Sequence, residues 1–168
     1  CLSMPAFAGS ALDEIRESGV IRMCYLPSAP PFSFEQEGAP TGYSVQLCEA
    51  VARDMGRRMD KALRIEWVKL TLQNRLEAVQ EGRVHVECGT TTWTLTRQEA
   101  VDFSLMTFID GGTVLVRADS AALHIDDLAD KRIGVVPGTT TESNLKHALD
   151  QRRITANVVA VESPDQGL

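Results

Sequence analysis

The chain has 168 residues, of which 43% are hydrophobic and 24% are charged, and its formal net charge at pH 7 is −6. This length and composition fit one globular domain or two small lobes, and they exclude a disordered or fibrous chain. The acidic balance argues against a nucleic-acid partner, and no apolar run reaches the ~18 residues that a membrane span requires.

The first residues have the character of a targeting segment. The sequence does not begin with methionine, so we expect that something preceded Cys1 and has been removed or omitted. Ala6-Phe7-Ala8 matches the small-x-small pattern of a signal-peptide cleavage site, which predicts a secreted protein whose mature form starts near Gly9. A lipid anchor on Cys1 and a plain disordered tail are two further interpretations. Residues 1–10 are therefore expected to be a signal-peptide remnant or a disordered tail.

Strand and helix patterns alternate through the next eighty residues. The pattern predicts a helix at 11–18, a strand at 20–25, a helix at 44–59, a strand at 63–68, a helix ended by Gly82 and a strand at 83–87. Residues 27–32 hold three prolines, so we expect a rigid loop there and a turn at 38–42. That loop either holds Phe32 or Phe34 as a wall over a ligand, or lets Phe32 fill the core.

The segment at residues 87–104 carries the main functional prediction. Gly89 is followed by five threonines within seven residues and then by Arg97, with Thr96 and Glu99 spaced as a capping box. Threonine hydroxyls and backbone groups can hold an ammonium or a carboxylate, and arginine binds a carboxylate through two parallel hydrogen bonds. A capped turn whose arginine lies in solvent is the alternative interpretation.

Arg75 is a second candidate cation. It lies in the first turn of the expected helix before Gly82, where a positive charge opposes the helix dipole. A tertiary or ligand partner would offset this unfavourable placement, and a surface arginine is the alternative.

A second unit follows an expected strand at 113–117 and a polar stretch at 118–122. We expect a helical turn at 125–128, a strand at 132–136, a helix reaching about residue 150 and a strand at 157–161. Thr139 and Glu142 form a capping box, and Gly138 allows close backbone approach. The start of this helix is then either an anion site or an ordinary cap.

The cysteines and histidines show no metal-ligand spacing. Cys24 and Cys88 are expected in neighbouring strands and Cys48 on a helix, and we expect buried free thiols. The sequence therefore predicts no metal site and no cofactor.

The order of elements predicts an α/β fold of two lobes, each with a mostly parallel sheet flanked by helices. Lobe 1 is expected at residues 11–116 and an incomplete lobe 2 at 117–168, with a hinge near 114–119. Ligands of open α/β sheets bind at the carboxyl ends of the strands. The candidate loops all follow strands in this way, so we expect one cleft between the lobes.

Several short motifs occur in a fixed order from Leu12 to Leu168. They are Pro31-Phe32-Ser33-Phe34, Gly42-Tyr43-Ser44, Asn74-Arg75, Thr94-x-Thr96-Arg97, Val101-Asp102-Phe103-Ser104 and Gly138-Thr139-Thr140. Together they resemble the extracellular solute-binding proteins of polar amino-acid ABC transporters. Glu87-Cys88-Gly89-x-Thr91-Thr92, Gln73-Asn74-Arg75 and Gly138-Thr139-Thr140-x-Glu142 are most similar to the glutamate/aspartate-binding subgroup. The resemblance implies a periplasmic-binding-protein-like fold, a periplasmic location and amino-acid transport.

The resemblance also implies a role for individual residues. Arg97 would bind the α-carboxylate of the ligand with help from Thr92, and Thr90 would meet the α-ammonium. Thr140 would close on the α-carboxylate from lobe 2, and Arg75 would face a side-chain carboxylate. Hinge closure would then be read by an ABC permease in the inner membrane. The expected ligand-binding residues are Arg97, Thr92, Thr90, Arg75, Thr140, Thr139, Phe32 and Gly89.

Two departures from the family pattern limit this prediction. Leu26, Leu72 and Pro164 stand where the acidic subgroup carries polar side chains, so glutamate or aspartate is only the leading guess among α-amino acids. The family's chain is also longer, so we expect a fragment, or an incomplete lobe covered by a second copy in a swapped homodimer.

Two other classes of function use the same fold. One is a periplasmic enzyme similar to cyclohexadienyl dehydratases, for which Glu87 is the candidate acid or base, although its place at a strand end indicates a structural role. The other is a ligand-binding sensor domain of a receptor, which would continue into a membrane span.

Overall fold

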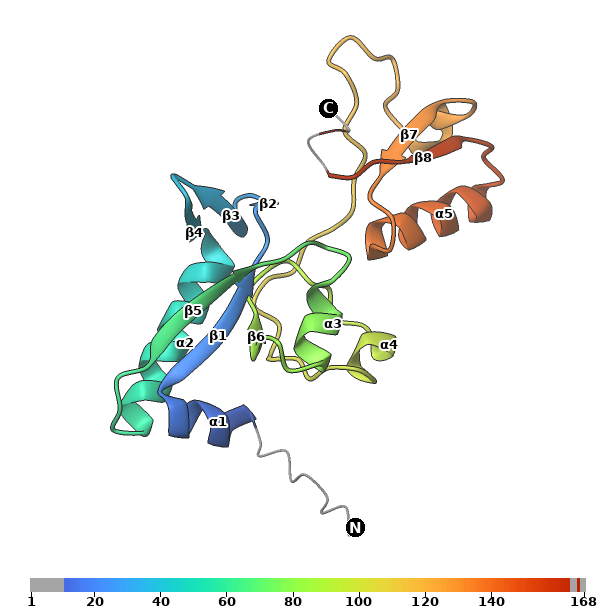
Figure 1. Cartoon of the computed structure of the whole chain (residues 1–168). Coiled ribbons are helices and arrows are strands. Elements are labelled where there is room, and N and C mark those ends of the chain that lie inside the picture. Colours follow the sequence, from blue (N-terminus) through green and yellow to red (C-terminus); the bar gives the residue numbers. More distant parts are fainter. Residues whose placement is uncertain (1–10, 164–165, 167–168) are drawn as a thin grey trace. The chain divides into compact units, whose positions relative to one another are not determined.

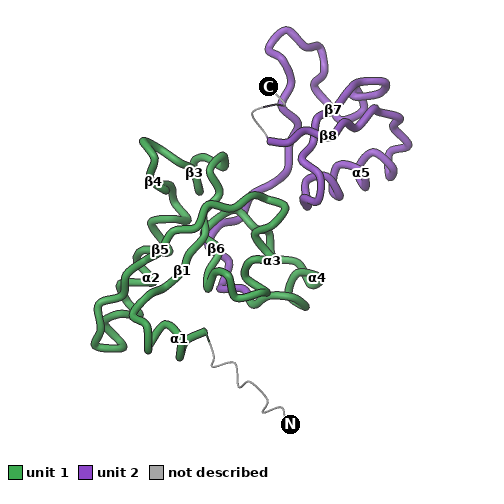
Figure 2. The backbone as a smooth tube through the Cα atoms, viewed as in Figure 1, with its two compact units in different colours: residues 1–102 green, residues 103–168 purple. Residues whose placement is uncertain are grey.

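The computed structural model describes residues 11–163 and residue 166 (Figure 1). The expected signal-peptide remnant or tail and Pro164 lie outside the described residues. The chain forms two compact units, Cys1–Asp102 and Phe103–Leu168 (Figure 2), and each is described here by itself. The predicted α/β class is confirmed, whereas the expected hinge near residues 114–119 stays a prediction.

Unit 1 is built on a three-stranded parallel sheet in the order β5-β1-β6. Its helices and strands in chain order are α1 (Ala11–Ser18), β1 (Val20–Tyr25), α2 (Tyr43–Arg58), β5 (Arg64–Lys69), α3 (Arg75–Gln80), β6 (Val86–Glu87) and α4 (Leu95–Gln98). The predicted elements are thus present, but the last strand is two residues long instead of five. Because all three strands run in the same direction, the loops after β1, β5 and β6 leave one edge of the sheet.

The central strand β1 explains why both faces of this sheet are covered. Its residues alternate between faces, so Met23 packs in a cluster with Ala52 of α2, while Cys24 packs in another with Ala78 of α3. Trp67 is only half-buried against the first cluster. The core of unit 1 therefore has two layers of apolar contact, one on each side of β1.

A small antiparallel sheet occupies the region expected to be a rigid loop and a turn. It consists of β2 (Ser28–Ala29), β3 (Ser33–Gln36) and β4 (Ala39–Thr41) in the order β2-β3-β4. The prediction was wrong here because Pro40 lies on an edge strand, where a missing N–H costs no ladder hydrogen bond. Ser33, wholly buried, accepts a hydrogen bond from the Leu26 N–H (2.9 Å) and so ties the small sheet to the end of β1.

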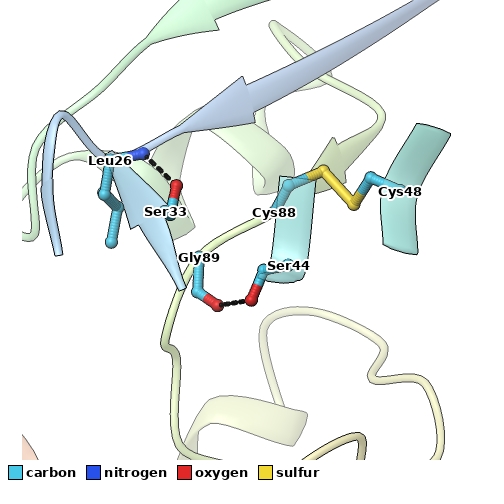
Figure 3. Close-up of a disulfide and its surroundings, with 6 residues drawn as sticks. All are labelled: Leu26, Ser33, Ser44, Cys48, Cys88 and Gly89. Carbon is cyan, nitrogen blue, oxygen red and sulfur yellow. Dashed lines mark hydrogen bonds between the residues drawn. A yellow bond between two sulfur atoms is a disulfide. The ribbon is translucent and has the colours of Figure 1, made fainter. Parts of the chain in front are cut away.

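Cys48 on α2 and Cys88 after β6 form a disulfide, which corrects the expectation of free thiols (Figure 3). The crossover from β1 through α2 to β5 lays α2 over the sheet face toward which Cys88 points, and sequence spacing alone does not show this. Cys24 remains a buried free thiol. In the part of the chain that is described, no helix has the length and apolar character to cross a membrane.

Unit 2 contains one parallel β-α-β arrangement. It comprises the short 3₁₀ helix η1 (Ile125–Leu128), β7 (Arg132–Val135), α5 (Thr140–Arg152) and β8 (Asn157–Ala160), in agreement with the predicted elements. Leu128, Ile133 and Leu149 form its core. The helix cap is also largely as predicted, since Thr139 Oγ1 accepts from the Glu142 N–H at 3.2 Å. The Glu142 carboxylate, however, accepts from the Gly138 N–H at 2.8 Å and closes the cap one residue earlier than expected.

The prediction of a strand at residues 113–117 was wrong. Among the described residues, this segment forms no strand and pairs with none. Apolar β-branched residues favour a strand, but a strand needs a neighbour to satisfy its backbone groups. Leu115 is 75% exposed, whereas Val114 and Val116 line a cavity of about 250 Å³ beside η1.

Candidate functional site

The threonine-rich loop after β6, residues 89–94, is attached to α2 at its base. The Ser44 hydroxyl of α2 donates to the Gly89 carbonyl at 2.8 Å, and the disulfide joins the preceding residue, Cys88, to Cys48 one turn further along the same helix (Figure 3). The Cys88 N–H also donates to the Cys24 carbonyl of β1 at 3.0 Å. Three attachments within two residues therefore fix where the loop starts.

Little space is left for a side chain at the position of Gly89. A Cβ added there would meet Glu87 Oε1 far inside van der Waals contact and would lie 2.8 Å from Leu26 Cδ1. The backbone of the loop is thus packed directly against the carboxylate of Glu87. No other residue type fits without a shift of these neighbours.

The short helix α4 brings Arg97 back toward the loop. Thr94 is its N-cap and accepts from the Arg97 N–H at 3.2 Å, so the predicted capping box of Thr96 and Glu99 is wrong. The helix begins two residues earlier than the sequence suggested, at Leu95 instead of Arg97, which places Thr96 inside it. Arg97 Nη1 donates to the Thr92 carbonyl at 2.9 Å, so two of the predicted site residues are in direct contact.

Arg75 is buried, and the interpretation as a surface arginine is wrong. The residue is only 3% exposed. Its Nε donates to the Thr91 hydroxyl and its Nη1 to the Leu72 carbonyl, while Nε lies 3.9 Å from Glu87 Oε1. Burial lowers the pKa of Arg75, and the charge of Glu87 opposes this effect. The predicted tertiary partners exist, while contact with a ligand carboxylate stays a prediction.

Glu87 is not among the predicted ligand-binding residues, since the sequence offered it only as the acid or base of the enzyme alternative. Its side chain is 14% exposed, and Oε1 is buried with no hydrogen-bond partner among the described residues. Burial raises the pKa of Glu87, whereas Arg75 and hydrogen bonds from Thr91 and Gly89 act to lower it. The signal in the sequence was a carboxylate at a strand end, two residues before a glycine.

The remaining predicted residues of unit 1 lie on the same edge of the sheet or beside it. Thr90 and Thr92 are exposed on the loop. Phe32 is half-buried, with its ring 6.0 Å from Tyr43 in an edge-to-face arrangement, and its carbonyl accepts from the Ser44 N–H at 2.9 Å. Phe32 therefore sits at the start of the helix that anchors the loop.

Thr139 and Thr140 lie in unit 2, at the start of α5. The Thr139 hydroxyl donates to the Val136 carbonyl at 2.8 Å and accepts from Glu142, so its role in the cap is shown. Within the described part of the chain, no group of His, Cys, Asp or Glu could hold a metal ion.

Comparison with known proteins decides the family. Residues 21–160 match the bacterial extracellular solute-binding proteins, family 3. The chain belongs to this family. The glutamate/aspartate import solute-binding protein of Escherichia coli K12 is 29% identical over 92% of the chain and 52% of the relative. The L-glutamate/L-aspartate-binding protein of Pseudomonas aeruginosa is 31% identical over 96% of the chain and 55% of the relative. This family 3 chain spans about half the length of the curated relatives that it matches.

Solved structures confirm the predicted fold of the family 3 chain. An ancestral amino acid-binding protein, a precursor of cyclohexadienyl dehydratase, aligns with a TM-score of 0.81 at 29% identity and covers 94% of this chain and 67% of its own. A periplasmic binding protein of an ABC transporter from Brucella ovis, with glutathione bound, aligns with a TM-score of 0.82 at 24% identity. The alignment covers 95% of this chain and 50% of the Brucella chain, and at this identity it supports the fold alone. The periplasmic-binding-protein-like fold is thus established for the part of it that this chain spans.

Proposed function

We propose that the chain binds a free polar L-amino acid in a cleft between its two units and delivers it to an ABC permease of the inner membrane. Glutamate or aspartate is the leading ligand, because relatives that match nearly the whole chain are named for these amino acids. The observation that carries the proposal is the contact of Arg97 with the carbonyl of Thr92, which holds a guanidinium over a loop of hydroxyls.

The chemistry of this loop suits the head group of an amino acid. A guanidinium has five N–H donors, and the bond to Thr92 uses one of them. The remaining donors can take the α-carboxylate with two charge-assisted hydrogen bonds, each contributing about 1.5–3 kcal/mol. Thr90 is an exposed residue whose hydroxyl and carbonyl oxygens would accept from the α-ammonium, and Thr92, also exposed, would assist Arg97 at the α-carboxylate.

Unit 2 would complete the site through the start of α5. The helix has 13 residues, and its first turn offers backbone N–H groups and a favourable dipole to a carboxylate. Since the Thr139 hydroxyl is engaged in the cap, Thr140 and the backbone of the first turn would make this contact. Closure about the hinge expected at residues 114–119 would bring the β-α-β part of unit 2 onto the loop of unit 1.

The proposal has no chemical step, and it places the protein in the periplasm. Relatives are named as import or binding proteins, which gives no support to the dehydratase or sensor alternatives. Leu105, Ile109 and Leu115 of unit 2 are each at least 75% exposed, and a second copy in a swapped homodimer would cover such a surface.

Isothermal titration of the protein with the common amino acids tests this function. We expect binding of an acidic or polar amino acid, and a loss of about 100-fold or more in affinity for R97Q, because two charge-assisted bonds disappear. R64Q is the matched control, since Arg64 is an exposed arginine on β5. Equal affinity of R97Q and wild type would show that Arg97 does not bind the ligand.

A further inference from the structure

The buried pair of Arg75 and Glu87 has electrostatic consequences beyond its own stability. Arg75 comes from the first turn of α3 and Glu87 from the end of β6, and Nε lies 3.9 Å from Oε1. The two side chains are 4% and 14% exposed. A buried charge is energetically costly unless an opposite charge lies beside it. The net charge of this buried site is therefore the sum of the charges of Arg75 and Glu87.

This pair lies directly under the loop proposed to bind the ligand. The Arg75 Nε donates to the hydroxyl of Thr91. On the other side of Thr90, the backbone of Gly89 packs against the Glu87 oxygen that has no hydrogen-bond partner among the described residues. Protein, and not water, therefore fills the space between the pair and Thr90. Because protein screens a charge less than water does, the net charge of the pair acts on Thr90 with little screening.

The other charged or titratable groups near the pair are few. Arg97 of α4 is close enough to lower the pKa of both partners, and Cys24 of β1 faces them as a neutral thiol, because burial raises its pKa to about 12. With Glu87 ionised, Arg75 and Glu87 cancel, and the net positive charge at the loop is that of Arg97 alone. Without the carboxylate, the loop would carry the charge of both arginines.

We propose that Glu87 is a specificity-determining residue, whose carboxylate cancels the charge of Arg75 and so weakens the preference for an acidic ligand over its amide. The inference rests on the proposed function, and it adds to that function the residue that determines the relative affinity for an acidic amino acid and its amide. The head group of glutamate and glutamine is the same, so Arg97 does not distinguish them. The side chains differ by one negative charge, and that charge interacts with the net charge below the loop.

The substitution Glu87→Gln tests the proposal, because the amide keeps the shape and an acceptor oxygen while removing the charge. We expect the ratio of Kd for glutamine to Kd for glutamate to rise about tenfold, from one unit charge at a distance of about 10 Å with an effective dielectric constant of ~20. The aspartate and asparagine pair should shift in the same direction. Titration calorimetry at about neutral pH and low salt measures all four ligands.

Glu66→Gln is the matched control. It makes the same formal change in charge on an exposed carboxylate of β5, and we expect its ratio to stay within about twofold of wild type. The double variant Arg75→Gln with Glu87→Gln removes both charges and should bring the ratio back down from its value in E87Q. This double variant also serves where E87Q alone does not fold.

Each outcome of the titrations has a separate meaning. Weaker binding of acid and amide by the same factor in E87Q would make Glu87 merely structural and overturn the proposal. A double variant whose ratio stays as high as that of E87Q would show that the charge of Arg75 is not what Glu87 cancels, which also overturns it. No binding of any amino acid to wild type would refute the proposed function and this inference with it, whereas binding with an unchanged ratio refutes this inference alone.

Discussion

Substitution of Gly89 by alanine is the sharpest test of how the loop after β6 is packed. Gly89 does not have a positive φ, so the alanine backbone itself is not strained. The added Cβ, however, would overlap Glu87 Oε1 and lie 2.8 Å from Leu26 Cδ1, so both side chains would have to shift. Overpacking of this kind costs about 1–3 kcal/mol, and we expect about 2 kcal/mol, because the atoms that must move are the ends of two side chains that are themselves largely buried.

Urea denaturation followed by tryptophan fluorescence measures this cost. Both tryptophans, Trp67 and Trp93, lie in unit 1, so their signal reports the unfolding of the unit that contains Gly89. Gly82→Ala is the comparison, since nothing lies within 4 Å of its added Cβ and the only penalty is its φ of +70°, worth about 1 kcal/mol. We expect G89A to be less stable than G82A. A free energy of unfolding for G89A within about 0.5 kcal/mol of wild type would refute the packing described here.

Three further predictions concern the stability and reactivity of unit 1. Reduction of the Cys48–Cys88 disulfide, which closes a loop of 40 residues, should lower the free energy of unfolding by about 4 kcal/mol in the chain-entropy treatment, and the C48A/C88A double variant should not respond to reductant in the same urea titration. Hydrogen bonds from Arg22 and His85 lower the pKa of Glu14 from 4.5 to about 2, so its carboxylate stabilises the fold above pH 4.5 and this contribution is lost as the pH falls toward 2. E14Q should therefore show a flatter dependence of stability on pH across that range, and a profile parallel to wild type would contradict the assignment. Burial raises the pKa of the Cys24 thiol to about 12, so the Cys24 peptide should stay unlabelled by iodoacetamide in the native protein at about pH 8 and become labelled in urea, as peptide mass spectrometry can show.

Local patterns predicted the elements whose formation depends mainly on their own residues. The apolar run of β1, the stripe of α2 and the cap of α5 are properties of neighbouring positions along the chain, and all three are present. The segment at 113–117 has an equally good strand pattern but no partner among the described strands, so its pattern was not sufficient. The small β2-β3-β4 sheet shows the reverse case, because its short strands exist through pairing despite their prolines.

The candidate site was predictable where it follows strand ends and unpredictable where it depends on contacts between elements. Arg97 and Thr92 are close in sequence, and their contact follows from the turn between them. The pairing of Arg75 with Glu87 requires knowledge of how α3 packs beside β6, and the disulfide requires the position of α2 over the sheet. The partners in each of these contacts are 12 or more residues apart along the chain, and only the fold brings them close together.

The anchoring of the loop base by α2 has a consequence for engineering. Since Ser44 and Cys48 hold the residues just before Thr90, the exposed positions that follow can be exchanged while their foundation stays the same. If the proposed function holds, grafting the corresponding segment of another binding protein onto this base should change the ligand that is bound without a redesign of the supporting helix. Trp93, 46% exposed in the middle of that segment, would report occupancy optically without an added dye.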